Sequence, residues 1–279
     1  MCADDGIPPD EKAYLQRVVE TLKDVFKDAL LSVFLVGSAA YGQYQPGMSD
    51  LDVQAIVADE AVTSNSVRTT AQKLSHSTLP CPARLLEFVL YTETAALTPS
   101  PRPLWSLNLN TGATRSADAI QLQIGNSEHG SLDNNPGGSH WFLLDLACAR
   151  ELGRTLYGLA NTAQAFAAPE RTWVLGALRD CITWFAEADP TNPSAILNAC
   201  RACRWAADQV WGSKVQGAEW ALARRGEEGL SEEEKELVSQ AMNLRKGGVE
   251  EGLDLARAQS FLRDRAREVA RLLDLDSST

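Results

Sequence analysis

The stretch Val33-Phe34-Leu35-Val36-Gly37-Ser38, followed eleven residues later by Asp50-Leu51-Asp52-Val53, decides the expected fold. Its first part is short, apolar and rich in β-forming residues, which is typical of a buried strand. Gly37-Ser38 then permits a sharp turn whose exposed N–H groups suit phosphate oxygens. Acids alternate with apolar residues in the second part, which predicts that Asp50 and Asp52 lie on one face of a second strand.

These two carboxylates repel each other unless a cation lies between them, and no cationic residue is next to them in the sequence. Because oxygen-only ligands favour Mg²⁺ over zinc, we expect a magnesium site at Asp50 and Asp52. The alternative interpretation is a pair of solvated carboxylates on an edge strand.

Glu87 is a third acid, inside the apolar run Ala83–Tyr91 that predicts a third strand. A carboxylate is costly to bury in such a strand without a partner. We therefore expect Glu87 to face the pocket of the other two acids. There it would be a third metal ligand or the base that takes a proton from an attacking hydroxyl. The alternative is an edge-strand glutamate that faces water.

Length and composition indicate a globular protein with room for two domains: 279 residues, 44% apolar and 23% charged. The acidic N-terminus lacks the pattern of a signal peptide, and no apolar run is long enough to span a membrane, so we expect a cytoplasmic protein. A formal net charge of −11 argues against a nucleic-acid surface and would suit a polycationic small molecule. Cys200 and Cys203 lack a second pair, which favours reduced core thiols over a zinc site.

The order of patterns predicts an α/β half followed by an all-helical half. Helices are expected over 9–31, 61–76 and 139–153, and a short strand near Trp105–Leu109. A long loop is expected over 126–138, and His129 and His140 are treated as surface or capping residues rather than ligands. From Pro169 onward every apolar pattern is helical, over ranges 172–188, 194–211, 216–225, 231–243 and 256–273.

The Gly-Ser turn, its spacer and Asp-x-Asp resemble the signature of the nucleotidyltransferase superfamily. The motifs Ala149-Arg150-Glu151 and Arg201…Lys214…Glu219-Trp220 look like the aminoglycoside (3″)(9) adenylyltransferases, which modify streptomycin and spectinomycin. This resemblance covers most of the chain. It implies an α+β fold, with a nucleotidyltransferase domain at residues 1–157, a short mixed sheet flanked by helices, and a helical bundle at residues 158–279.

The resemblance also implies an activity: magnesium-dependent transfer of AMP from ATP to a hydroxyl of an aminoglycoside-like acceptor, with release of pyrophosphate and a role in antibiotic resistance. Asp50, Asp52 and Glu87 would be the magnesium and catalytic acids. Gly37 and Ser38 would hold the triphosphate. Arg201 and Lys214 would reach the nucleotide phosphates across a cleft between the domains. We expect a monomer that binds a small cationic molecule and neither nucleic acid nor membrane.

The acceptor-binding stretch departs from the streptomycin-modifying relatives. Trp184 would correspond to their tryptophan, and Glu187 or Asp189 to one of their acids, but the spacing is not kept and Thr191 stands where an acid is expected. A different acceptor, either a metabolite or a protein, is therefore an open alternative. A non-catalytic, antitoxin-like nucleotide-binding module is another.

Overall fold

The computed structural model describes residues 6–113, 121–124, 139–159, 161–226, 229–248 and 252–276. The chain forms two compact units, one of Met1–Pro136 with Asp145–Pro169 and the other of Gly137–Leu144 with Glu170–Thr279. Helix α5 (Ser139–Leu152) contributes residues to both. The boundary predicted at residues 157 and 158 lies within the last segment of the first unit and stays a prediction.

A mixed sheet forms the centre of the first unit. Among the described residues it has six strands, in the order β5-β4-β3-β2-β1-β6. Their bounds are β1 (Leu30–Val36), β2 (Leu51–Val57), β3 (Leu86–Thr92), β4 (Leu107–Thr111), β5 (Gln121–Ile124) and β6 (Arg154–Gly158). Strands β2 and β3 are parallel, and the other neighbouring pairs are antiparallel. The strand predicted over Ala83–Tyr91 corresponds to β3, which begins at Leu86. The short strand predicted near Trp105–Leu109 corresponds to β4.

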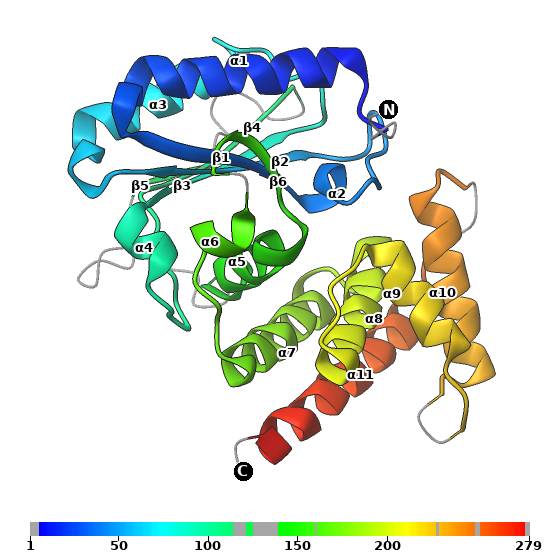
Figure 1. Cartoon of the computed structure of the whole chain (residues 1–279). Coiled ribbons are helices and arrows are strands. Elements are labelled where there is room, and N and C mark those ends of the chain that lie inside the picture. The colour runs from blue at the N-terminus through cyan, green and yellow to red at the C-terminus, as the bar shows by residue number, and fades with distance from the viewer. Residues whose placement is uncertain are drawn as a thin grey trace. The chain divides into compact units, whose positions relative to one another are not determined.

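Helices cover both faces of this sheet. Their bounds are α1 (Pro9–Phe26), α2 (Gly37–Ala40), α3 (Ser64–Leu74), α4 (Glu93–Leu97) and α6 (Thr162–Ala165), with short 3₁₀ turns η1 (Lys27–Ala29) and η2 (Asp59–Ala61). Figure 1 shows α1 and α3 along one face, with α5 and α6 on the other. The predicted first helix was too long: α1 ends at Phe26 because Lys27 adopts a φ of 51°, and β1 begins three residues later.

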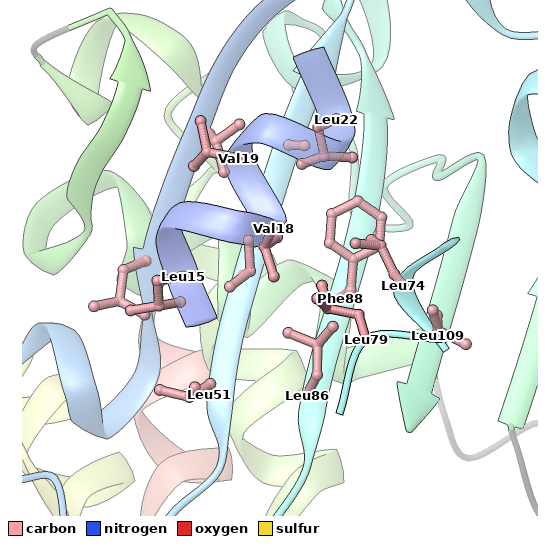
Figure 2. Packing of buried hydrophobic residues seen from close by; sticks show 14 of the residues in the cluster. Leu15, Val18, Val19, Leu22, Leu51, Leu74, Leu79, Leu86, Phe88 and Leu109 are labelled. Carbon is pink, nitrogen blue, oxygen red and sulfur yellow. The ribbon is translucent and has the colours of Figure 1, made fainter. Parts of the chain in front are cut away.

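The apolar stripe of α1 packs on the sheet, as its periodicity predicts. Figure 2 shows Leu15, Val18, Val19 and Leu22 above side chains of β2 and β3, all within one buried cluster. Because side chains alternate along a strand, Leu51 and Val53 face this cluster and Asp52 faces the opposite side of the sheet. The apolar alternation thus determines on which face the acids lie.

The opposite face of the sheet is covered by the chain after α5. Phe34 of β1 contacts Phe166 with ring centroids 5.3 Å apart, and Tyr91 of β3 contacts the same ring edge-on. Arg150 of α5 donates hydrogen bonds to the carbonyls of Ala163 and Phe166, which fastens the α6 segment to α5. Arg150, recognised in the sequence as part of a motif, therefore holds together the layer that covers this face.

The second unit is helical, as predicted. Its further helices are α7 (Arg171–Ala188), α8 (Pro193–Asp208), α9 (Lys214–Ala223), α10 (Glu232–Arg245) and α11 (Leu255–Asp276). α7 packs against α8 and α11, and α8 also packs against α9 and α10. Cys200 and Cys203 are buried and form no disulfide, which agrees with the expectation of core thiols. None of the described helices has the length and hydropathy needed to cross a membrane. The α+β fold class with a helical C-terminal region is confirmed.

Candidate active site

Gly37, the first residue of α2, is in direct contact with Asp52. Its φ of 63° is in the left-handed region that favours glycine. A Cβ atom on Gly37 would lie 1.9 Å from Oδ2 of Asp52, far inside van der Waals contact. Glycine is therefore required here twice over, for the turn after β1 and for the close approach of the Asp52 carboxylate.

Asp52 and Glu87 are neighbours on the parallel strands β2 and β3, where they pair directly in the register. Burial is the largest cause that raises the pKa of Asp52 well above its usual value. The charge of Glu87 is the next cause, the charges of Asp145 and Asp50 follow, and a hydrogen bond with the Glu87 side chain adds to them. Two carboxyl groups that lie this close share a proton readily, since both cannot be ionised without a counter-charge.

Asp50 precedes β2 by one residue and pairs with Arg84, in the segment before β3. Nε of Arg84 donates to Oδ1 of Asp50 at 2.9 Å, and its terminal nitrogen donates to Oδ2 at 2.5 Å. A metal is therefore not the only cation that can lie beside these acids, because the fold brings Arg84 to Asp50. The position of Arg84, three residues before Glu87, was the available signal.

Asp145 on α5 is a fourth acid near this cluster, and sequence reasoning missed it. Its charge contributes to the raised pKa of Asp52 and, after burial, to that of Tyr91 on β3. One turn later on the same helix, Sγ of Cys148 lies 2.8 Å from the hydroxyl of Tyr41, directly after α2. This face of α5 therefore lies beside the Gly37 turn and the acids. No sequence pattern marks Asp145.

The spacer between the Gly-Ser turn and Asp50 is anchored to α1. The hydroxyl of Tyr44 donates to Oε1 of Glu11 at 3.0 Å, and Glu11 is only 6% exposed. Burial is the main cause that raises the pKa of Tyr44, so this hydroxyl stays a donor at neutral pH. The main-chain N–H of Gln45 donates to the hydroxyl of Ser49, which closes the turn just before Asp50. These bonds hold the start of β2 in place.

The two predicted nucleotide-binding cations lie in the second unit. Arg201 is on α8 and Lys214 is the first residue of α9. The two helices touch at Gly217, where a Cβ would lie 2.6 Å from the Cα of Arg201. Ser213 caps α9 by accepting from the N–H of Gln216 at 3.1 Å, which fixes where the helix begins. The contact at Gly217 thus brings the segments that carry both cations together.

The predicted acceptor-binding residues lie at the C-terminal end of α7 or just after it, and each has a different partner. Trp184 contacts Trp141 of α5 edge-on, with ring centroids 5.7 Å apart. Glu187 is exposed and lines a cavity of about 220 Å³ with Arg263 and Arg267 of α11. Asp189 follows the helix and accepts from Nδ2 of Asn192 at 2.8 Å. Trp141 was not predicted from the sequence.

His140 is buried beside Trp141, with ring centroids 4.6 Å apart, so it is not the surface residue that was one of the two expectations. Burial lowers its pKa to about 4, and the charge of Asp180 opposes that shift. The other histidine considered as a ligand, His129, lies outside the described residues.

The donor set at the acids fits magnesium that is shared with a nucleotide. Within the described part of the chain, no three His, Cys, Asp or Glu side chains are arranged to hold a metal ion by themselves. Mg²⁺, however, is usually bound by one or two carboxylates together with substrate phosphates and water. Asp50, just before β2, and Asp52, within it, supply that number of carboxylates.

The first unit thus carries these acids on a mixed sheet beside a Gly-Ser turn, and the second unit is helical. Residues 168–270 match the family model "Aminoglycoside adenylyltransferase, C-terminal domain". The matched range includes Arg201 and Lys214.

A solved structure extends the likeness to most of the chain. The crystal structure of spectinomycin adenyltransferase AAD(9) from Enterococcus faecialis with ATP and spectinomycin is similar with a TM-score of 0.64. It is 15% identical, and the likeness covers 92% of this chain and 99% of that chain. At this identity the likeness establishes the fold. No curated protein sequence matches the chain.

Proposed function

We propose that this protein is a magnesium-dependent adenylyltransferase that moves AMP from ATP to a hydroxyl of a cationic, aminoglycoside-like small molecule and releases pyrophosphate. One observation carries the proposal: the carboxyl groups of Asp52 and Glu87 lie side by side across β2 and β3, against the turn at Gly37. A pair of buried carboxyl groups beside a tight turn supplies both a metal ligand and a base within one site.

In this mechanism each acid has a separate role. Asp50 and Asp52 would hold the magnesium ion, which when bound stabilises negative charge on the α-phosphate and on the leaving pyrophosphate. Glu87 takes the proton from the acceptor hydroxyl as its oxygen attacks the α-phosphate. Gly37 and Ser38 bind the triphosphate. The guanidinium of Arg201 and the ammonium of Lys214 neutralise phosphate charge that the metal leaves unpaired.

Charge and aromatic side chains support a cationic, sugar-containing acceptor. The net charge of −11 and the acid Asp145 near Asp52 favour a positively charged ligand. Trp141 and Trp184 are partly buried aromatic residues that supply flat apolar surfaces of the kind that sugar rings pack on. We propose Trp184 as an acceptor contact, with Glu187 and Asp189 as acids near it.

The test is pyrophosphate release with ATP and magnesium, measured with spectinomycin, streptomycin and other aminoglycosides. Glu87→Gln should abolish turnover while calorimetric titration still detects ATP–magnesium binding, because the amide keeps the shape and loses the base. Full activity of this variant would remove Glu87 from the mechanism. ATP binding without turnover on any aminoglycoside would point to a different acceptor, and failure to bind ATP would reject the proposal.

A further inference from the structure

Arg84 donates hydrogen bonds to both carboxylate oxygens of Asp50, the residue proposed as a magnesium ligand. The two hydrogen bonds, 2.9 Å from Nε to Oδ1 and 2.5 Å from the terminal nitrogen to Oδ2, form the bidentate fork that guanidinium makes with carboxylate. Both oxygens of Asp50 therefore have a partner before any metal arrives.

The pair is asymmetric in exposure. The side chain of Asp50 is 15% exposed, whereas that of Arg84 is 49% exposed. Asp50 is also fixed by its place at the start of β2, after the turn closed by Ser49. The arginine is the partner that can move, since half of its long side chain is already in solvent.

Arg84 acts on the whole acid cluster. Beyond its two hydrogen bonds to Asp50, Arg84 also interacts electrostatically with the negative charges of Glu87 and Asp52. Buried carboxylates without a counter-charge are costly. Arg84 therefore supplies, in the metal-free protein, positive charge at the place where a divalent cation is expected.

A guanidinium and a divalent cation cannot both stay next to Asp50 at low cost. Mg²⁺ bound at its usual distance of about 2.1 Å would lie within a few ångströms of the guanidinium, and like charges that close repel. Metal alone must therefore displace Arg84 into water. Metal that arrives with ATP brings a new partner, because guanidinium pairs with phosphate oxygens as well as with carboxylate.

We propose that Arg84 is an exchangeable counter-ion: it neutralises Asp50 in the metal-free protein and moves from Asp50 to a nucleotide phosphate when metal and ATP bind together. This inference rests on the proposed function, since it uses the same acids. The exchange of Arg84 between Asp50 and phosphate makes the site selective for the metal–nucleotide complex over the free metal ion. Arg84 then acts through Asp50 in the metal-free protein and contacts the nucleotide directly once metal and ATP are bound.

The experiment measures Mn²⁺ affinity by electron paramagnetic resonance on the full chain, first without nucleotide and then with ATP. Three variants are compared with the unchanged protein. Arg84→Met removes the charge and keeps the length, and Arg84→Lys keeps the charge and loses the fork. Arg68→Met removes an exposed charge from α3, on the other face of the sheet. Circular dichroism and thermal unfolding verify that each variant is folded.

We expect Arg84→Met to bind Mn²⁺ alone roughly three- to tenfold more tightly, a modest factor because the ion pair is partly exposed. Its affinity for Mn²⁺ with ATP should not increase. The affinity of Arg84→Lys for Mn²⁺ alone should lie between those of the unchanged protein and Arg84→Met. Arg68→Met should have the affinity of the unchanged protein. If Arg84→Met fails to fold, a tightening in Arg84→Lys without nucleotide supports the proposal and an unchanged affinity overturns it.

Two other results would overturn the inference: unchanged or weaker binding of Mn²⁺ alone by Arg84→Met, or equal tightening with and without ATP. These outcomes differ from failure of the proposed function. If the unchanged protein binds no Mn²⁺ even with ATP, the magnesium site itself is rejected. If it binds Mn²⁺ with ATP but transfers AMP to no aminoglycoside, the comparison of the Arg84 variants remains valid.

Discussion

Asp52 in β2 and Glu87 in β3 pair directly across two parallel strands, and a hydrogen bond joins their carboxyl groups. Parallel pairing is what makes this possible, because residues after two different loops then reach the same end of the sheet. The same end carries the Gly37 turn, whose missing Cβ leaves room for the Asp52 carboxylate. The site therefore depends on contacts at the scale of single atoms, which substitutions can test.

Gly37→Ala should lose most of the proposed AMP-transfer activity. Its Cβ would overlap Oδ2 of Asp52, and a misplacement of about 1 Å in a catalytic group can cost roughly a hundredfold in rate. Gly42→Ala is the matched control, because Gly42 has a φ of 68° and nothing within 4 Å of its Cβ position. That control should lose only about 1 kcal/mol of stability from backbone strain. Steady-state kinetics and thermal unfolding test both, and equal activity of the two variants would contradict the steric argument.

Gly217→Ala should destabilise the second unit and weaken ATP binding. The added methyl group would meet the backbone of Arg201 at 2.6 Å, and overpacking of this kind typically costs about 1–3 kcal/mol. Gly176→Ala in α7 is the control, because nothing lies within 4 Å of its Cβ position. It should instead stabilise the protein by up to about 1 kcal/mol, through helix propensity.

Chemical denaturation and calorimetric titration with ATP–magnesium separate the two effects of the Gly217 substitution. A Gly217→Ala variant as stable as Gly176→Ala would show that α8 and α9 separate without cost. Normal ATP affinity in a destabilised Gly217→Ala variant would remove the proposed link between this helix contact and the position of Arg201.

His140 should make stability depend on pH. In the folded protein burial lowers its pKa to about 4, partly opposed by Asp180, whereas the unfolded chain has the ordinary value of 6.5. The unfolded state therefore binds the proton more readily. The contribution of the neutral His140 to the free energy of unfolding is fully present above pH 6.5 and is lost as the pH falls from 6.5 towards 4.

Between pH 7.5 and pH 5 the loss for this single group is about 2 kcal/mol. His140→Gln removes the titration, so its free energy of unfolding should fall less than that of the unchanged protein over this range. Urea denaturation at the two pH values measures the difference, and all other titrating groups cancel in the comparison. Equal pH dependence of the two proteins would mean that the imidazole is already accessible to protons in the folded state.

Most of the secondary structure could be predicted because it follows from local patterns. The stripe of α1, the alternation in β2 and the helical spacing after Pro169 each reflect one buried face of one element. Element ends were less predictable. α1 stops at Phe26 because Lys27 takes a positive φ, and α8 stops at Asp208 because Gln209 does the same. Neither lysine nor glutamine is a residue type that predicts a positive φ from the sequence.

The candidate site was only partly predictable for a related reason. Glu87 could be singled out because a charged residue interrupts an apolar run, which is a local feature. Arg84 interrupts the same run but was passed over, and no motif includes Asp145. The importance of both comes from what lies near them in the fold. The expectation that His140 lies at the surface was wrong because the burial of its ring depends on how the helices pack, which no local pattern reports.

By itself the sequence determined the elements, their buried faces and the glycine turn, because these depend on residues within a few positions of one another. Only the tertiary structure decided that Asp50 pairs with Arg84, that Asp145 lies near Asp52 and that Trp141 contacts Trp184. Each of these contacts joins residues on different elements. Such contacts are set by strand register and helix packing, which depend on the whole buried core rather than on any one stretch of the chain.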